Sequence, residues 1–327
     1  MNILFAIQGT GNGHVSRARD FIPELKKYAN IDILLSGTQV DVELGHDVKY
    51  RKNGLSFVFG KSGGVDYGKT IKTLHPQKFF SDLWNIDLKS YDFILNDFEP
   101  VTAWAGKLKN KKVIALSHQS AFLSKKTPRY MEKNKTAEFL YKNYAPCDKF
   151  YAFHFEQYDE NIYTPIIRRE IRTISPTKNG HYTVYLPAYD DKYLLQFLHQ
   201  IDFVHWHVFS KHEKNGYSIG NVDVLPIDNQ KYNQSVASSS GLLTGGGFEA
   251  PAEAMFLGKK VLAIPMKGQY EQFCNAAAME QMGVPVVYNI DQNFIYILRD
   301  WVQNHEAVKV DFPDNAAMIT EKIFKEL

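Results

Sequence analysis

Short apolar runs alternate with stretches of helical spacing along most of this chain of 327 residues. The first run, residues 3–7, ends in a glycine-rich turn, and apolar residues then recur at helical spacing between residues 15 and 28. An apolar strand, a glycine turn and an amphipathic helix make the opening unit of a parallel sheet. Because the alternation continues, the pattern predicts an α/β fold with a doubly wound layer.

The alternation occurs in two series. In the first we expect strands at residues 31–35, 93–96 and 113–117 and helices near residues 78–89, 101–108 and 132–144. Two prolines and a glycine punctuate residues 163–180, which we interpret as a linker. In the second series we expect strands at residues 182–186, 203–209, 222–225, 241–243, 261–264 and 286–287, helices at 191–200 and from 229, 248 and 270, and a final helix over 315–327.

The length fits two domains, since a domain typically takes roughly 100–200 residues. We therefore predict two Rossmann-like domains, residues 1–170 and residues 177–304, that face an interdomain cleft. In such folds ligands bind at the carboxyl ends of the strands.

Composition narrows the function classes. Apolar residues make up 44% and charged residues 23%, as in ordinary globular proteins, and the net charge of +2 gives no electrostatic case for nucleic acid. Cys147 and Cys274 form no CxxC pair, and no apolar stretch approaches the roughly 20 residues that span a bilayer. We expect a cytoplasmic protein. The basic stretch at residues 125–135 is either a solvated face or a peripheral contact with anionic lipid.

The glycine loop after the first strand ends in a histidine. A dinucleotide fingerprint would need glycine at position 14, where His14 stands. A helix N-terminus disfavours imidazolium, so a neutral His14 facing the cleft could act as a base. Asp97, after the strand at 93–96, could hold one ring nitrogen of His14 and orient it. The alternatives are a structural histidine and an aspartate that caps the helix beginning at Pro100.

A strand followed directly by a glycine run and a helix marks the second half. The segment comprises Gly245, Gly246, Gly247, Phe248 and Glu249. Free amides at a helix N-terminus bind phosphate, and glycines let a pyrophosphate approach the backbone. Glu253 lies one turn after Glu249 and could accept hydrogen bonds from ribose hydroxyls. A plain loop and solvated glutamates are the alternative.

Further polar residues follow other expected strands. Glu271 and Gln272 offer acceptors and donors for sugar hydroxyls, although Glu271 could simply cap its helix. His118 ends the strand at 113–117 and either touches an acceptor or caps that strand.

His205 and His207 face one side of a strand, but two histidines without a carboxylate make a poor metal site. With no Asp-x-Asp in the chain, we expect no metal and no cofactor at the reacting centre.

Taken together, these motifs resemble the GT-B glycosyltransferases, in particular the UDP-glycosyltransferases and the peptidoglycan N-acetylglucosaminyl transferase that makes lipid II. The resemblance implies that His14 is the general base, that Asp97 supports it and that Glu253 binds the donor ribose. It also implies donor-sugar contacts from Glu271 and Gln272 and a last helix, residues 315–327, that crosses back to the first domain. On the acceptor side we place Gly11, Asn12, Gly13 and His118.

We therefore expect an inverting, metal-independent glycosyltransferase that moves a sugar from a nucleotide diphosphate to an acceptor hydroxyl. UDP is the leaving group that the resemblance implies, and the residues do not exclude TDP or GDP. Glu271 replaces the commoner aspartate, so the donor sugar stays open, as does the acceptor: a small molecule, a glycan or a lipid-linked group. The alternatives are a UDP-sugar 2-epimerase on the same fold and a non-catalytic nucleotide-sugar-binding subunit, which a wide separation of His14 and Asp97 would favour.

Overall fold

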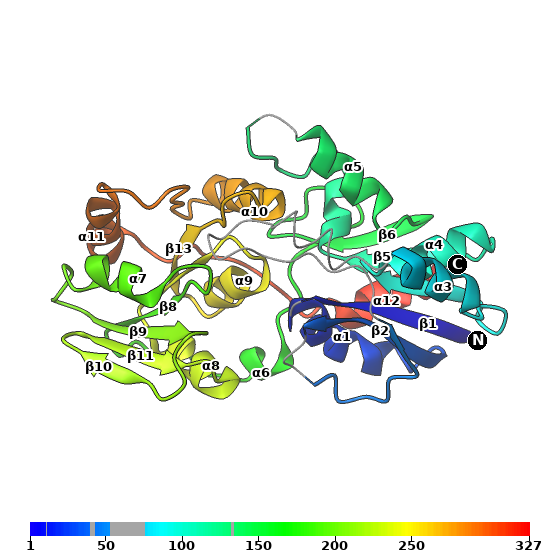
Figure 1. The fold of residues 1–327 in the computed structure, drawn as a ribbon, viewed down its shortest axis with the longest axis horizontal. Coiled ribbons are helices and arrows are strands. Elements are labelled where there is room, and N and C mark those ends of the chain that lie inside the picture. Colours follow the sequence, from blue (N-terminus) through cyan, green and yellow to red (C-terminus); the bar gives the residue numbers. More distant parts are fainter. Residues whose placement is uncertain (11, 40–42, 53–75, 132–133) are drawn as a thin grey trace.

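The computed structural model describes the chain except for residues 11, 40–42, 53–75 and 132–133. It contains a seven-stranded sheet of order β3-β2-β1-β4-β5-β6-β7 and a six-stranded sheet of order β10-β11-β9-β8-β12-β13. The strand pairs in the described parts are parallel except β10 with β11. The predicted α/β fold with two Rossmann-like sheets is confirmed (Figure 1).

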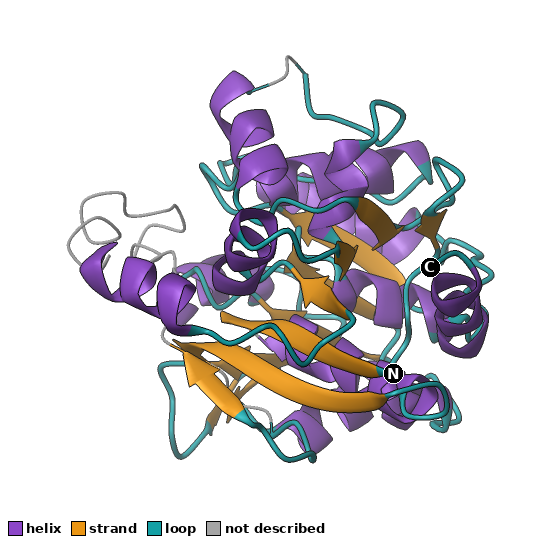
Figure 2. Cartoon of the chain, turned by 90° about the vertical axis from the view of Figure 1, so that its right-hand side faces the viewer, coloured by secondary structure: helices purple, strands orange, loops and turns teal. Residues whose placement is uncertain are grey.

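The first sheet is built around β1, which pairs with β2 on one side and β4 on the other. Residues 3–7 of β1 are at most 1% exposed, because helices cover both faces of this sheet (Figure 2). The strands of this sheet are β1 (Asn2–Thr10), β2 (Asn30–Gln39), β3 (Tyr50–Lys52), β4 (Phe93–Asp97), β5 (Val113–Ser117), β6 (Lys149–Phe153) and β7 (Ile162–Tyr163). The helices between them are α1 (Asn12–Leu25), α3 (Pro76–Asn85), α4 (Pro100–Leu108), η1 (Gln119–Leu123) and α5 (Lys135–Asn143).

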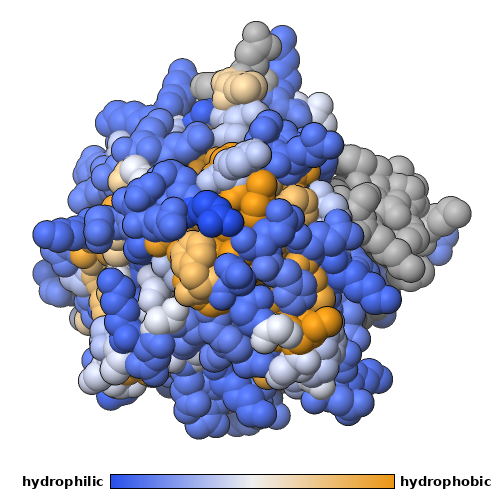
Figure 3. All heavy atoms as spheres, turned by 90° about the vertical axis from the view of Figure 1, so that its left-hand side faces the viewer, coloured by the Kyte–Doolittle hydropathy of each residue, from blue (hydrophilic) through white to orange (hydrophobic). Residues whose placement is uncertain are grey.

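The second sheet follows a short helix, α6 (Arg169–Arg172), which lies inside the segment that we predicted as a linker. Its strands are β8 (His181–Tyr185), β9 (His205–Ser210), β10 (Tyr217–Ile219), β11 (Val222–Pro226), β12 (Gly241–Gly245) and β13 (Lys260–Ile264). Its helices are α7 (Asp191–Leu198), α8 (Asn229–Ser238), α9 (Glu249–Phe256), α10 (Tyr270–Gln281) and α11 (Phe294–Asn304). The outer end of this half has a mostly hydrophilic surface with apolar patches between (Figure 3).

The last helix, α12 (Ala316–Lys325), packs on α1 of the first half although it follows the second half in the chain (Figure 1). Phe324 stacks on Tyr28 with ring centroids 4.9 Å apart, and Ile319 and Ile323 are buried. One hydrophobic cluster contains residues of both sheets, including Phe5 on β1 and others on β12 and α9. The two halves therefore share part of their core.

Several expected elements differ from the structure. The strand expected at residues 286–287 is only an isolated bridge between Val286 and Ala263. The strands β3, β6, β7 and β10 and the helices α6 and α11 were not predicted. Other boundaries shift by a few residues, as helix and strand ends commonly do. Within the described parts of the chain, no helix is long and apolar enough to cross a membrane.

Candidate active site

A cavity of about 370 Å³ lies between the two halves. The loops that follow β1, β4, β5, β12 and β13 reach it, so both sheets present their carboxyl ends to it. From the first half it is lined by Gln8, Gly13, His14, Phe98, His118, Gln119, Asn134, Thr136, Ala137, Leu140, Tyr141 and Tyr144. From the second half it is lined by Gly247, Phe248, Glu249, Gly268, Gln269, Tyr270 and Glu271.

His14 and Asp97 lie in hydrogen-bond contact at this cavity. The distance from His14 Nδ1 to Asp97 Oδ1 is 2.7 Å, and the two side chains are 12% and 1% exposed. A carboxylate only accepts, so the bond requires a proton on Nδ1 and leaves Nε2 of a neutral ring as an acceptor. This is the arrangement of an oriented base.

Arg17 is a third member of the cluster, which the sequence argument missed. Its Nη2 donates to both oxygens of Asp97 at 2.9 Å, and its Nη1 donates to Glu249 Oε1 at 2.8 Å across the boundary between the halves. Arg17 lies one turn after His14 on α1, and this i, i+3 spacing was a signal that could have indicated it. Burial alone would raise the pKa of Asp97, but the charges of Arg17 and His14 hold that pKa below its ordinary value.

Asp97 does not cap the helix that follows it, so that alternative is wrong. The cap of α4 is Glu99, whose carboxylate accepts from the amides of Val101 and Thr102. Phe98, between them, has a φ of 56°, which turns the chain sharply after β4. Since Glu99 serves the helix, the Asp97 carboxylate is available to His14 and Arg17.

The acceptor-side residues of the first loop have mixed outcomes. Gly13 lines the cavity, and a Cβ there would lie 2.6 Å from the carboxyl carbon of Glu249, so the close approach of the two halves depends on this glycine. Asn12 begins α1. Gly11 lies outside the described residues.

Gly245 is the last residue of β12, and Gly246 and Gly247, which follow it, have different roles. Gly247 and Phe248 line the cavity at the start of α9, where no side chain caps the helix. The Gly246 amide instead donates to Gln272 Oε1 at 3.1 Å. Gln272 also accepts from the Met266 amide at 2.9 Å, so its side chain joins two loops. Gly245, Gly246 and Gln272 are not among the described residues that line the cavity.

Glu253 forms an ion pair with Arg168 and is not among the described residues that line the main cavity. Arg168, just after the β7 segment, donates to both of its carboxylate oxygens at 2.5 and 2.7 Å. Burial raises the pKa of Glu253 although Arg168 opposes this. The side chain is 7% exposed, and it lies beside a small hollow with Glu249 and not on the described lining of the main cavity.

His118 and Glu271 also line the cavity. The His118 ring stacks on Phe248 with centroids 3.9 Å apart, and its nitrogens contact the Phe153 carbonyl and Asn275 Oδ1. Burial lowers the pKa of His118. Glu271 is 23% exposed and accepts from Gln119 Nε2 at about 3.3 Å. Both residues bridge the two halves and face the cavity.

An apolar wall from α5 covers this cavity, and the sequence argument did not include it. Leu140, Tyr141 and Tyr144 project from one side of the helix, and Tyr144 stacks on Phe98 with centroids 4.8 Å apart. Tyr270 of α10 donates to Glu138 at 3.0 Å and joins the wall to the second half. The wall gives the cavity a face suited to an apolar or aromatic part of a ligand.

The basic stretch at residues 125–135 is not a uniform cationic face. Arg129 is 8% exposed and bonds Glu138, and Lys126 pairs with Asp159 at 2.8 Å. Lys133 lies outside the described residues. The two alternatives for this stretch stay open.

The two mostly parallel sheets and the cavity at their carboxyl ends define a GT-B fold. Similar solved structures are Acinetobacter baumannii MurG (12% identity, TM-score 0.59, covering 99% of this chain and 98% of that one), the S. aureus MnaA–UDP structure (12%, 0.61, 99% and 94%) and Medicago truncatula UGT71G1 with UDP-glucose (12%, 0.58, 99% and 94%). No curated protein sequence matches the chain.

The family model described as glycosyl transferase family 1 matches residues 1–303. The chain therefore belongs to that family and is a glycosyltransferase.

Proposed function

We propose that this enzyme moves a sugar from a UDP sugar to an acceptor hydroxyl, with inversion and without a metal at the reacting centre. The observation that carries the proposal is the 2.7 Å contact between His14 and Asp97 at a cavity that the start of α9 also faces. A base and a phosphate-binding helix start on opposite walls are what a single displacement needs.

In the proposed reaction His14 Nε2 takes the proton of the acceptor hydroxyl while the oxygen attacks the anomeric carbon. The bond between that carbon and the diphosphate oxygen breaks, and its electron pair leaves with UDP. Asp97 accepts from Nδ1–H and stabilises the imidazolium that forms. Because attack and departure occur on opposite faces of one carbon, the anomeric configuration inverts.

The leaving diphosphate is proposed to lie on the amides of Gly247 and Phe248 at the start of α9. Helix amides and the helix dipole supply fixed positive ends where negative charge develops. The titles of two similar structures record UDP and UDP-glucose, which supports UDP as the nucleotide. No cofactor takes part in this proposal.

The wall made by α5 is proposed to hold the acceptor, because Leu140, Tyr141 and Tyr144 line the same cavity as His14. Aromatic and aliphatic side chains with few charges favour an acceptor that has an apolar portion.

A thermal-shift screen with UDP, TDP and GDP sugars tests the donor, since a ligand at 100 times its Kd stabilises by about 2.7 kcal/mol. The stabilising sugar is then incubated with acceptors and, separately, without any. Transfer that needs an acceptor and inverts the anomeric centre supports the proposal. An altered sugar formed without acceptor would indicate the epimerase, and binding without any product would indicate a non-catalytic subunit.

A further inference from the structure

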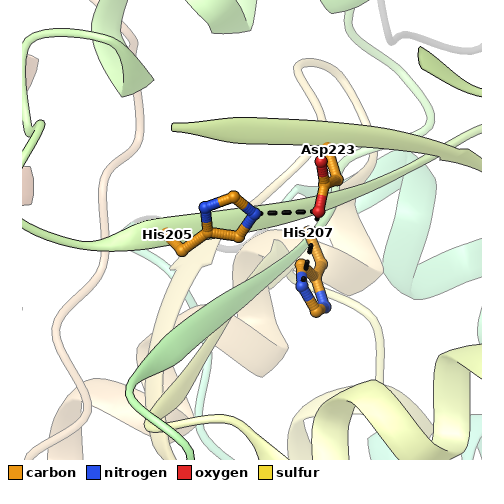
Figure 4. Close-up of side chains that lie close together, drawn as sticks. All are labelled: His205, His207 and Asp223. Carbon is orange, nitrogen blue, oxygen red and sulfur yellow. Dashed lines mark hydrogen bonds and ion pairs between the residues drawn. The ribbon is translucent and has the colours of Figure 1, made fainter. Parts of the chain in front are cut away.

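A second group of chemically active side chains lies at the edge of the second sheet opposite the cavity. The carboxyl ends of β12 and β13 lead to the cavity, and β9 and β11 run parallel to them within the sheet. His205 is the first residue of β9, so it lies at the amino edge, the edge of the sheet where these parallel strands begin. Here His205, His207 and Asp223 converge (Figure 4).

Strand pairing makes this cluster. His205 and His207 alternate along β9, which points both rings to one face of the sheet. Asp223 on β11 is the register partner of His207, and its Oδ2 lies 2.8 Å from His205 Nε2 and 3.8 Å from His207 Nε2. One ligand atom from each residue lies within 4.8 Å of the other two. The carboxylate that the sequence argument found missing comes from a strand 16 to 18 residues away.

Neighbouring groups hold these side chains by their other atoms. Ser218 donates to Asp223 Oδ1 at 2.5 Å, and Ser235 Oγ lies 3.1 Å from His207 Nδ1. His181 stacks on the His207 ring with centroids 4.1 Å apart. Oδ2 of Asp223 and Nε2 of His207 are thus left facing the centre of the cluster, as ligand atoms are when second partners orient them.

We propose that His205, His207 and Asp223 bind one divalent transition-metal cation, with zinc as the representative ion. Two imidazole nitrogens and one carboxylate oxygen suit zinc, cobalt and related ions, whereas magnesium and calcium prefer oxygen ligands. Tetrahedral zinc with bonds near 2.0 Å separates its ligand atoms by about 3.3 Å, a value between the two distances found here. Side-chain rotations would adjust these two distances and also the distance between the two histidine ligand atoms, which is at most 4.8 Å.

A metal that binds here needs His205 Nε2 without its proton, and it would replace the hydrogen bond between His205 Nε2 and Asp223 Oδ2. The three side chains are 44%, 27% and 30% exposed, so the ion is reached from solvent and retains a position for water or another external donor. This departs from our expectation that His205 and His207 make a poor metal site, which rested on the absence of a carboxylate ligand.

The test uses metal-stripped full-length protein titrated with Co²⁺, followed by visible absorption, and with Zn²⁺, followed by calorimetry. We expect one ion per chain and no binding of Mg²⁺. The His205→Gln and Asp223→Asn variants should each bind at least tenfold more weakly. His305→Gln is the matched control, because among the described residues His305 pairs with a single carboxylate, that of Asp300, at 3.4 Å, and this variant should bind the metal as the unaltered protein does.

His205 is the most exposed ligand, so its glutamine variant is the one best placed to fold normally, and its melting temperature is measured in chelator beside that of the unaltered protein. The proposal is overturned if the stripped protein gives no cobalt spectrum and no zinc heat. It is equally overturned if the folded His205→Gln and Asp223→Asn variants bind as tightly as the control, since the ion then lies elsewhere.

Discussion

Arg17 and Arg168 each hold a buried carboxylate near the boundary of the two halves, Arg17 on Asp97 and Arg168 on Glu253. Removing one member of a buried pair leaves the other charge uncompensated and costs about 3–5 kcal/mol. A substitution of either carboxylate therefore changes both stability and chemistry. Experiments on these residues need variants that keep the side-chain shape and a stability measurement on the same sample.

His14→Ala should lower kcat by ~10²–10⁴, the usual contribution of a positioned base. Donor affinity should barely change, because the proposed nucleotide contacts lie on α9. Asp97→Asn should cause a smaller loss of kcat, through a misoriented ring, together with a lower melting temperature because Arg17 loses its main partner.

The measurement is kcat and melting temperature on one preparation of each variant. A purely structural His14 predicts the reverse result: a lower melting temperature with normal turnover in the folded fraction. A folded His14→Ala enzyme that turns over normally would end the proposed mechanism.

The predicted ribose contact of Glu253 can be separated from its ion pair. If Glu253 binds the ribose, Glu253→Gln should weaken UDP binding at least tenfold, since bonds to a charged acceptor contribute about 1.5–3 kcal/mol each. Arg168→Gln should lower stability but leave UDP affinity equal or higher, because it removes the competing donor. Calorimetric titration of UDP into both variants decides the matter: if neither affinity changes while both melting temperatures fall, Glu253 serves only the ion pair.

The residues of the site differ in how far they could be predicted. His14 and Asp97 follow neighbouring parallel strands, and carboxyl ends of such strands meet at one edge, so their approach could be expected. Arg17 was within reach of the same reasoning, since it lies one helical turn beyond His14. The pair of Glu253 with Arg168 depends on the path of the linker, and the pair of His207 with Asp223 depends on strand register. Local spacing in the sequence reveals neither the path nor the register.

At the scale of elements, the turn from β12 into α9 depends on two loops that fit closely together. A Cβ on Gly246 would lie 2.8 Å from the Gln272 carbonyl oxygen and 2.9 Å from Pro265 Cβ, whereas a Cβ on Gly247 would meet nothing within 4 Å. The first glycine is needed for packing, and the second is open to the cavity.

Gly246→Ala should therefore destabilise the protein by about 1–3 kcal/mol, as overpacking does. Gly247→Ala is the matched control: it should melt normally, while UDP binds more weakly because the new methyl group stands in the proposed diphosphate site. Thermal melting with and without UDP measures both effects. Equal melting temperatures for the two variants would contradict the packing argument.

Most elements with a clear period were predicted, with α11 as an exception, and elements without one were not. Five successive apolar residues in β1 are typical of a strand buried on both faces, and in the structure all five are buried. The strand β7 has two residues, which pair with the sheet edge, and a strand this short shows no period. The helix α11 was predictable in principle, because Phe294, Leu298, Trp301 and Val302 recur at helical spacing and are buried.

At the scale of the whole molecule, the features that join the halves include the shared hydrophobic cluster, the Arg17–Glu249 ion pair and the return of α12 to α1. The residues that line the cavity are up to 263 positions apart in the chain, from Gln8 to Glu271. Local sequence patterns indicate two sheets, but the relative placement of these sheets follows from packing between distant surfaces. The wall made by α5 was missed for this reason.

Sugar transfer should persist in EDTA at an unchanged rate. In the proposed reaction the start of α9 supplies amides and a helix dipole where negative charge develops on the leaving diphosphate, so the proposal needs no cation there. The proposed metal cluster lies at the amino edge of the second sheet, away from the cavity, so its ion should affect stability alone. EDTA should accordingly lower the melting temperature of the unaltered enzyme but not that of His205→Gln, while both keep their turnover.

If turnover of both proteins collapses in EDTA and returns with Mn²⁺ or Mg²⁺, a metal acts at the reacting centre and the proposed mechanism is wrong. If only the unaltered enzyme loses turnover, and His205→Gln is slow with or without chelator, the remote ion controls the cavity through the sheet.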